Sequence, residues 1–275
     1  MRSPKSRAVL RRFHKMHGLG NDFVILDARS EAVAMTPALA VRLADRHQGI
    51  GCDQLIVLEP SDKADLRMAI FNADGGLAEA CGNAARCAIA LTGAARIETA
   101  GGIIDGETVE AEVEVAMGEP RFGWDEIPLA YAMDTAALPM AWDELAGPMA
   151  VNVGNPHLVF FVEAIDEARL GALGPVIEHD AAFPERINVN VAVIEGDEIR
   201  LRTWERGAGL TMACGTGACA TAVAAIANRR ASSPVTVRMK GGELEISWAP
   251  GEPVRMRGTA TRVFTGEIDL DAFGA

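Results

Sequence analysis

The chain has 275 residues, of which 49% are hydrophobic and 23% charged, a composition typical of a folded protein with a substantial core and unlike that of a disordered chain. The net charge of -12 argues against nucleic acid or an anionic membrane as a partner, because both require clustered Lys and Arg. The sequence has no apolar run of the ~20 residues that a membrane-spanning helix needs, so we expect a soluble protein.

The basic N-terminal segment, residues 1–12, lacks the apolar stretch and cleavage site of a signal peptide, and we expect a disordered tail there. A transit segment is the alternative, although twelve residues are short for one. The cysteines are odd in number, which favours reduced thiols and a cytoplasmic location over a disulfide framework. They are Cys52, Cys81, Cys87, Cys214 and Cys219, and they form no CxxC pair, so we expect no metal site.

Short strands alternate with a few helices along the chain. Helices are predicted, in chain order, over residues 37–46, 82–91, 165–170 and 215–227. The clearest strands are predicted over residues 187–194, 199–204, 235–239 and 244–248. The helices over 82–91 and 215–227 are nearly uncharged, which predicts that they are buried.

Two sequence landmarks occur twice at almost the same spacing. A Gly-Asn turn leads into an apolar stretch at residues 20–26 and again at 154–160, and a Cys-Gly pair opens an Ala-rich helix at Cys81 and again at Cys214. Cys81 follows Asn21 by 60 residues, and Cys214 follows Asn155 by 59. This internal repeat predicts two similar units related by approximate twofold symmetry.

The elements favour an α+β fold of two pseudo-symmetric domains, each a mixed, mostly antiparallel β-sheet or barrel wrapped around a central helix. Gly, two prolines and acidic residues interrupt the strand pattern over 118–128, which suggests the boundary. The first domain is predicted over 13–122 and the second over 123–261. The final segment, 262–275, is assigned to the first domain because its strand can return there.

A cysteine at the start of a helix lies near unpaired N–H groups and the positive end of the helix dipole, which predicts a lowered thiol pKa. The N–H groups of Gly82, Asn83, Gly215 and Thr216 would form a site for a substrate carboxylate. A duplicated cysteine without a duplicated histidine argues against nucleophilic catalysis and favours proton exchange. Inverting a stereocentre requires an acid/base group on each face, so Cys81 and Cys214 are predicted to be that pair.

Competing interpretations of these motifs are weaker. Cys52, Cys87 and Cys219 are predicted to fill the core, as free cysteines commonly do. Residues 215–220 fit a GxGxxA dinucleotide motif, but no acidic residue follows at the ~20-residue spacing that the motif requires. The only lysines are Lys5, Lys15, Lys63 and Lys240, none in a convincing Schiff-base setting, so no pyridoxal phosphate or other cofactor is expected.

A series of motifs, in order, resembles the diaminopimelate epimerase family from about Phe13 to the C-terminus. These motifs are residues 16–23 (MHGLGNDF), 72–75 (NADG), 81–83 (CGN), 154–157 (GNPH), 184–188 (PERIN), 205–209 (ERGAG) and 214–217 (CGTG). The resemblance implies an isomerase that converts LL-diaminopimelate to the meso form, in lysine and peptidoglycan biosynthesis. It also implies a small-molecule substrate and is compatible with a homodimer.

By motif matching, Cys81 and Cys214 are the acid/base pair and His157 assists the proton traffic of the second thiol. The resemblance assigns the distal amino-acid end of the substrate to Asn21, Gln54, Asn72, Asn155, Asn188, Glu205 and Arg206. Amides and Arg can hold a carboxylate, and Glu205, also counted with the catalytic residues, can pair with an ammonium.

Two alternatives remain open at this point. One is a racemase of another amino acid, such as proline, hydroxyproline or histidine, that uses the same two-cysteine mechanism. The other is a non-catalytic amino-acid binding protein, for which paired thiols at helix ends would serve no purpose. Exchange of the substrate's α-proton with solvent distinguishes an enzyme from a binding protein.

Overall fold

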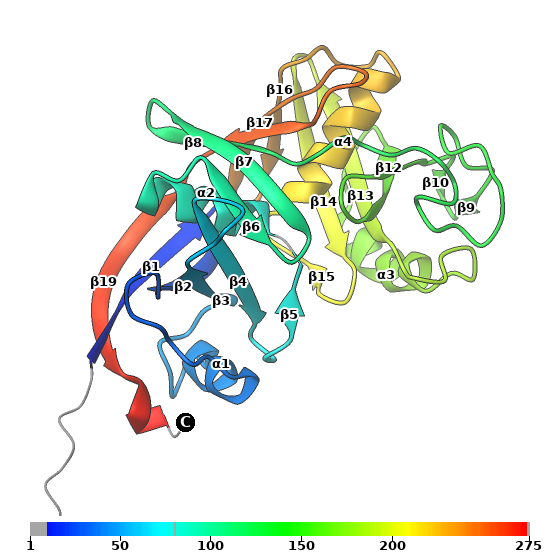
Figure 1. The fold of residues 1–275 in the computed structure, drawn as a ribbon. Coiled ribbons are helices and arrows are strands. Elements are labelled where there is room, and N and C mark those ends of the chain that lie inside the picture. Colours follow the sequence, from blue (N-terminus) through cyan, green and yellow to red (C-terminus); the bar gives the residue numbers. More distant parts are fainter. Residues whose placement is uncertain (1–9, 80, 274–275) are drawn as a thin grey trace, which may run out of the picture. The chain divides into compact units, whose positions relative to one another are not determined.

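The structure is a computed structural model that describes residues 10–79 and 81–273 (Figure 1). The described chain divides into two compact units. Unit 1 contains the residues up to Val113 and those from Ala260, and unit 2 contains Glu114–Thr259. The division falls earlier than residue 122, where the sequence suggested it, because β8 (Glu112–Ala116) pairs with β18 (Arg255–Gly258) and its last residues therefore belong to unit 2.

Unit 1 is built from strands with two α-helices. Its elements are β1 (Leu10–Gly18), β2 (Asn21–Asp27), α1 (Pro37–Ala44), β3 (Gln54–Glu59), β4 (Leu66–Asn72), β5 (Leu77–Ala78), α2 (Gly82–Thr92), β6 (Arg96–Thr99), β7 (Gly102–Val109), β19 (Thr261–Asp269) and the short η1 (Leu270–Phe273). β19 pairs antiparallel with β1, so the final segment returns to the first half as the sequence predicted.

This pairing also corrects the predicted tail. β1 begins at Leu10, which pairs with Asp269, so residues 10–12 are part of the sheet. The rest of the predicted tail, residues 1–9, lies outside the described residues.

Unit 2 repeats the plan of unit 1. Its elements are β9 (Ala141–Trp142), β10 (Leu145–Ala146), β11 (Met149–Asn152), β12 (Pro156–Phe161), α3 (Glu167–Glu178), β13 (Asn188–Glu195), β14 (Glu198–Glu205), β15 (Gly209–Leu210), α4 (Gly215–Ala227), β16 (Val235–Met239), β17 (Gly242–Ser247) and β18. The strands predicted over 187–194, 199–204, 235–239 and 244–248 correspond to β13, β14, β16 and β17.

Matching strand pairings confirm the internal repeat. β2 is antiparallel to β1 and parallel to β3, and β3 is antiparallel to β4. In unit 2, β12 is likewise antiparallel to β11 and parallel to β13, and β13 is antiparallel to β14. The strand that follows each long helix, β6 or β16, pairs parallel with β4 or β14. Each unit is therefore a mixed, mostly antiparallel sheet, as expected for the α+β class.

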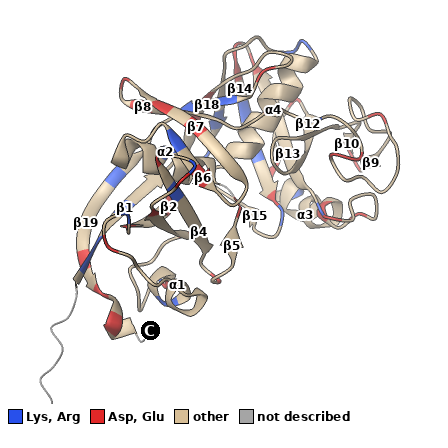
Figure 2. Cartoon of the chain, in the orientation of Figure 1, with Lys and Arg blue, Asp and Glu red and all other residues tan. Residues whose placement is uncertain are grey.

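The two Ala-rich helices lie in the cores of their units. α2 packs against β1, β2 and β7, whereas α4 contacts β11–β14 and β16–β18. Figure 2 draws α4 entirely in the colour of residues other than Lys, Arg, Asp and Glu, which agrees with its nine buried residues. Because these helices carry almost no charge, the surrounding strands can cover them on several sides.

Helix α3 is longer than the sequence predicted. The prediction ended it at Leu170, yet it runs to Glu178 and includes Gly171, Gly174 and Pro175, which weaken a helix. Its buried face, which includes Leu170, Leu173 and Ile177, packs into the core of unit 2 and outweighs that low propensity. Among the described residues, no helix is long and apolar enough to cross a membrane.

Candidate active site

The strand pairings bring the predicted polar residues of each unit together at neighbouring strand ends, on one side of its sheet. Asn21 and Gln54 begin the parallel strands β2 and β3, and Asn72 ends the antiparallel β4 opposite Gln54. In unit 2, Asn155 directly precedes β12, Asn188 begins β13 and Glu205 ends β14. The registers Phe23↔Gln54 and His157↔Asn188 therefore make Asn21, Gln54 and Asn72 the equivalents of Asn155, Asn188 and Glu205.

Each of the two candidate thiols occupies the N-cap position of its helix. Cys81 precedes α2 and Cys214 precedes α4, both with extended backbone angles. The first N–H groups of these helices belong to Gly82 and Asn83 and to Gly215 and Thr216. They lie at the positive ends of the helix dipoles, where a carboxylate is stabilised.

In unit 1, the Cys81 thiol lies 3.9 Å from Asn21 Oδ1. The same oxygen accepts a hydrogen bond from Asn83 Nδ2 at 3.3 Å, and Asn83 Oδ1 accepts one from the buried Arg86 at 2.8 Å. Arg86 is a residue that the sequence analysis did not single out. Its guanidinium can only donate, so it fixes the Asn83 amide with the NH2 group toward Asn21.

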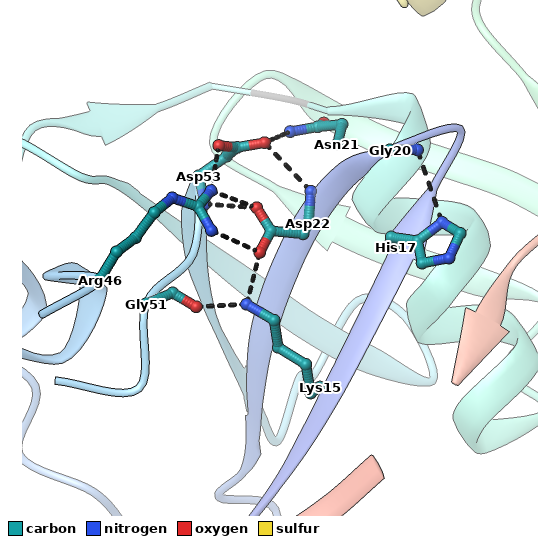
Figure 3. A network of polar contacts seen from close by, with 8 residues as sticks. All are labelled: Lys15, His17, Gly20, Asn21, Asp22, Arg46, Gly51 and Asp53. Carbon is teal, nitrogen blue, oxygen red and sulfur yellow. Dashed lines mark hydrogen bonds and ion pairs between the residues drawn. The ribbon is translucent and has the colours of Figure 1, made fainter. Parts of the chain in front are cut away.

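The other end of the Asn21 amide belongs to an ionic network, which Figure 3 shows around Arg46. Asn21 Nδ2 donates to Asp53 Oδ2 at 3.0 Å, and Arg46 donates to both Asp53 and Asp22 at 2.7 Å. Lys15 adds a further hydrogen bond to Asp22. Burial raises the pKa of Asp22, but the hydrogen bonds and charges of Arg46 and Lys15 outweigh it, so the pKa lies well below its usual value.

The Gln54 and Asn72 side chains form a second polar pair in unit 1. Gln54 Nε2 donates to Asn72 Oδ1 at 2.9 Å, and Gln54 Oε1 is buried without a hydrogen-bond partner among the described residues. Whichever way the two amides are turned, their mutual bond leaves one acceptor and one donor for a bound molecule. Such a pair suits the ammonium and carboxylate of an amino acid.

In unit 2, the Cys214 thiol is almost completely buried beside Glu205, Thr216 and the first turn of α4. Thr216 Oγ1 lies 3.5 Å from Cys214 Sγ, and the Gly217 N–H donates to that sulfur at 3.4 Å. The thiol donates to the Glu205 carboxylate, which also accepts from Thr211 Oγ1. Burial raises the pKa of Glu205, and these two hydrogen bonds offset part of that rise.

The pKa of Cys214 differs from the expectation for a cysteine at a helix start. Burial and then the negative charge of Glu205 raise this pKa well above the usual value, whereas the hydrogen bonds from Thr216 and Gly217 lower it. Desolvation is stronger than the helix dipole here because the thiol lies inside unit 2 and not at its surface. In the structure Cys214 is therefore a neutral thiol that donates to a carboxylate.

His157 is fully buried, and both of its ring nitrogens are engaged by asparagines. Nε2 lies 2.8 Å from Asn155 Oδ1, and Nδ1 lies 3.1 Å from Asn190 Nδ2. Burial and the nearby charge of Arg206 lower the pKa of His157 to about 3, so the ring is neutral. Each ring nitrogen of His157 therefore already has an asparagine partner, and its role in the proton traffic of the second thiol stays a prediction.

Two further predicted site residues in unit 2 have structural partners. The buried Asn188 donates to Pro156 O at 2.8 Å and accepts from the Arg206 N–H at 2.9 Å. The Arg206 guanidinium is exposed and donates to Glu185 O at 2.9 Å. Asn188 therefore holds the two adjoining loops, and Arg206 keeps N–H groups that can reach a ligand.

The three remaining cysteines fill the core, as predicted. Burial raises the pKa of Cys52 to about 11 and that of Cys87 to about 12, so both are inert thiols at neutral pH. Cys219 is likewise inaccessible on α4. Within the described ranges, no three His, Cys, Asp or Glu side chains are grouped so that they could hold a metal ion.

The sequence analysis missed the residues that support this site from behind. Arg86, Asp53, Asn190 and Thr211 each hold a predicted site residue in place, and Thr203 in turn holds Asn190. A comparison of the two repeats could have found two of them, since Asn190 and Thr203 occupy buried strand positions that are Ile56 and Ile70 in unit 1.

Comparisons with known proteins agree with this arrangement. The family model described as diaminopimelate epimerase matches residues 13–123 and 149–263. The chain is 63% identical to the diaminopimelate epimerase of Rhizorhabdus wittichii, over 96% of this chain and 97% of that protein. It is 61% identical to the diaminopimelate epimerase of Sphingopyxis alaskensis, over 96% and 99% of the respective lengths.

Solved structures with low sequence identity share the fold. A hydroxyproline epimerase from Agrobacterium vitis has a TM-score of 0.65 at 14% identity, covering 95% of this chain and 93% of that chain. A probable proline racemase from Agrobacterium radiobacter has a TM-score of 0.66 at 16% identity, covering 96% and 94%. At such identities the similarity concerns the fold alone. The family match and the high identity to its members show that the chain belongs to the diaminopimelate epimerase family.

Proposed function

We propose that the protein interconverts LL-diaminopimelate and meso-diaminopimelate by proton exchange between two thiols. The observation that carries this proposal is the equivalent placement of Cys81 and Cys214 at the starts of α2 and α4, in the two repeats of a chain of this family. Curated relatives that are 63% and 61% identical are diaminopimelate epimerases. The enzyme is accordingly an isomerase.

The proposed reaction needs one thiolate and one thiol at a time. The thiolate removes the α-proton from one face of the substrate, and the thiol of the other cysteine delivers a proton to the opposite face. Glu205 accepts the Cys214 proton when Cys214 has to act as the base, because the two groups already share a hydrogen bond. The N–H groups of Gly82, Asn83, Gly215 and Thr216 stabilise the carboxylate next to the carbanion.

The distal amino-acid end of the substrate requires donors and acceptors that do not react. The Gln54 and Asn72 pair supplies one of each, and Arg206 and Asn155 add donors in unit 2. Asn21 contributes by holding its oxygen toward Cys81. We assign Asn188 an indirect role, since its amide is bonded to the backbone at Pro156 and Arg206.

We further propose that catalysis needs no pyridoxal phosphate. Lys15 is engaged with Asp22 and Gly51, and Lys63 and Lys240 form exposed ion pairs with Glu98 and Glu167. None of these surroundings resembles a Schiff-base pocket.

The cytoplasm, where thiols stay reduced, is the proposed location of the protein. Lysine and peptidoglycan biosynthesis is its proposed pathway. A homodimer is the proposed assembly, supported by the exposed Val263 and Phe264 on β19.

The experiment is an exchange assay in D2O with defined diaminopimelate isomers. The protein should convert the LL isomer to the meso isomer and introduce deuterium at the inverted α-carbon, as NMR and mass spectrometry would detect. Proline, hydroxyproline and histidine serve as competing substrates and should show no exchange. Exchange with one of these and none with diaminopimelate would establish the alternative racemase.

A further inference from the structure

The interior of unit 2 contains a chain of polar side chains that leads to the site. Thr203 Oγ1 lies 2.9 Å from Asn190 Oδ1, Asn190 Nδ2 lies 3.1 Å from His157 Nδ1, and His157 Nε2 lies 2.8 Å from Asn155 Oδ1. The exposed fractions of Thr203, Asn190 and His157 are 4%, 0% and 0%. Burying polar groups is unfavourable unless each is hydrogen-bonded, and here each one is.

Elementary hydrogen-bond chemistry determines which group donates and which accepts in each bond between these polar side chains. Asn190 Nδ2 also donates to the Leu158 carbonyl at 2.9 Å, and a carbonyl can only accept, so the orientation of the Asn190 amide is determined. Its second N–H group then donates to His157 Nδ1. The neutral imidazole must carry its single proton on Nε2, which donates to Asn155 Oδ1. The Asn155 oxygen is thereby occupied and its NH2 group remains to bind a ligand.

The fold itself does not require polar residues at these positions. The strand registers place Phe23, Ile56 and Ile70 of unit 1 at the positions equivalent to His157, Asn190 and Thr203. Those three apolar side chains are at most 1% exposed, so the same sheet is built in unit 1 with an apolar core. A buried polar chain in only one of two equivalent cores is better explained by function than by folding.

Unit 2 also makes room for this chain at the start of α4. A Cβ atom on Gly217 would lie 2.7 Å from Asn190 Oδ1 and 2.9 Å from Thr203 Oγ1. The equivalent residue of unit 1 is Ala84, which has a Cβ atom and is fully buried. The close approach therefore links the polar chain to the helix turn that donates to Cys214.

The equivalent asparagine of unit 1 is held in the opposite sense. Asp53 accepts from the Asp22 N–H and from Arg46, so it is a carboxylate acceptor and Asn21 must turn its NH2 group toward it. Asn83 donates to the Asn21 oxygen from the other side, and that oxygen faces Cys81. Asn21 thus uses its nitrogen for support and its oxygen toward the thiol, the reverse of Asn155.

We propose that Thr203, Asn190 and His157 form a polarity relay that fixes the Asn155 amide as a hydrogen-bond donor to a substrate carboxylate, while the Asp53 and Asn83 contacts fix Asn21 as an acceptor. The equivalent residues of the two repeats then differ, because Asn155 offers a hydrogen-bond donor and Asn21 offers an acceptor. An amino acid has a donor ammonium and an acceptor carboxylate, so Asn155 can bind its carboxylate but not its ammonium, and the reverse holds for Asn21. The inference rests on the proposed function for the identity of the ligand, and His157 is a positioning residue in it.

The first test is the protonation state of His157 in the intact wild-type protein. Nitrogen-15 NMR of histidine-labelled protein at neutral pH should show a neutral ring with the proton on Nε2, unchanged when the pH is lowered to about 5. A proton on Nδ1, or a charged imidazolium at neutral pH, would overturn the relay. This readout does not depend on activity, so it is independent of whether diaminopimelate is the substrate.

The second test removes a link that does not touch the ligand. Asn190→Leu, of similar size, should leave the fold intact but release the His157 proton to either nitrogen and lower kcat/KM about tenfold, mainly through KM. Thr221→Val is the matched control, because it removes another buried hydroxyl of unit 2, one with no hydrogen-bond partner among the described residues, and should leave KM unchanged.

A folded Asn190→Leu protein with wild-type KM would contradict the proposal. If that variant does not fold, His157→Phe, which copies Phe23 of unit 1, replaces it with the same expected rise in KM. Failure of the proposed function would give a different result. The wild-type protein would then exchange no α-proton of diaminopimelate, while His157 would still carry its proton on Nε2.

Discussion

The Cys214 thiol donates a hydrogen bond to the Glu205 carboxylate in the interior of unit 2, and the charge of Glu205 adds to the effect of burial in raising the pKa of that thiol. Glu205 thereby keeps Cys214 protonated in the free protein, yet it is also the group placed to take the proton away. Replacing the carboxylate by an amide should separate these two effects.

We expect Glu205→Gln to lower the pKa of Cys214, because the change removes the negative charge beside the thiol and leaves a neutral, weaker acceptor for its S–H group. Iodoacetamide should then modify Cys214 faster than in the wild-type protein at pH 8, as measured by mass spectrometry. Epimerisation should fall about 100-fold or more, since a general base is lost. Glu167→Gln, which removes the charge of an exposed carboxylate paired with the buried Arg202, is the control and should change neither rate. Slower alkylation in Glu205→Gln would show that its charge does not raise this pKa.

The two-thiol mechanism predicts a sharp difference among the cysteines. Cys81→Ala and Cys214→Ala should each abolish net epimerisation, because one face of the α-carbon would lack its acid/base group. Cys87→Ala and Cys219→Ala should keep wild-type kcat and lose about 1 kcal/mol of unfolding free energy, since each removes a buried sulfur from the core. Chiral separation of the products and urea unfolding test both parts. Full activity in either of the first two variants would contradict the mechanism.

The ion pairs of Asp22 predict a stability difference that depends on pH. The folded pKa of Asp22 is depressed, so its contribution is complete above the unfolded value of about 3.9 and disappears as the pH falls through the lower folded value. Asp22→Asn should cost about 2 kcal/mol of unfolding free energy at pH 7, because Lys15 and Arg46 lose a charged partner.

Urea unfolding of wild type and Asp22→Asn between pH 7 and pH 3 measures this difference, which should shrink below about pH 4. Asp27→Asn, at the more exposed pair with Arg29, is the control and should cost less than about 1 kcal/mol. An Asp22→Asn effect that stayed constant over this pH range would exclude an ionic origin.

The two glycines of helix α3 should respond oppositely to alanine. A Cβ atom at Gly174 would lie 2.4 Å from Trp204 Cδ2, so Gly174→Ala must displace the indole that donates to Glu178 and should cost about 1–3 kcal/mol. At Gly171 the nearest atom is Leu210 Cδ1 at 3.5 Å, an ordinary contact. Gly171→Ala should therefore be neutral or stabilise the protein by up to about 1 kcal/mol. Thermal unfolding followed by tryptophan fluorescence compares the two variants.

Local patterns were sufficient to predict the two Ala-rich helices and the internal repeat to which they belong. The Ala-rich stretches after Cys81 and Cys214 form α2 and α4, within one residue of the predicted ends, because hydrophobic periodicity and the absence of charge act over adjacent turns. They were insufficient for α3, whose second half is held by the burial of Leu173 and Ile177 in spite of Gly and Pro. A contact with a distant strand cannot be read from the helix's own residues.

The sequence by itself determined that this protein has two similar halves, each with a cysteine at a helix start and polar residues at recurring strand ends, because these features are written in spacing and residue type. Only the tertiary structure decided which of those groups are charged and which are neutral. It buries Cys214 beside Glu205, which raises the pKa of the Cys214 thiol. It also buries His157 as a neutral ring with hydrogen bonds to Asn155 and Asn190. The pKa of a group and the direction of a hydrogen bond depend on solvent exclusion and on partners far apart in the chain, which no local pattern contains.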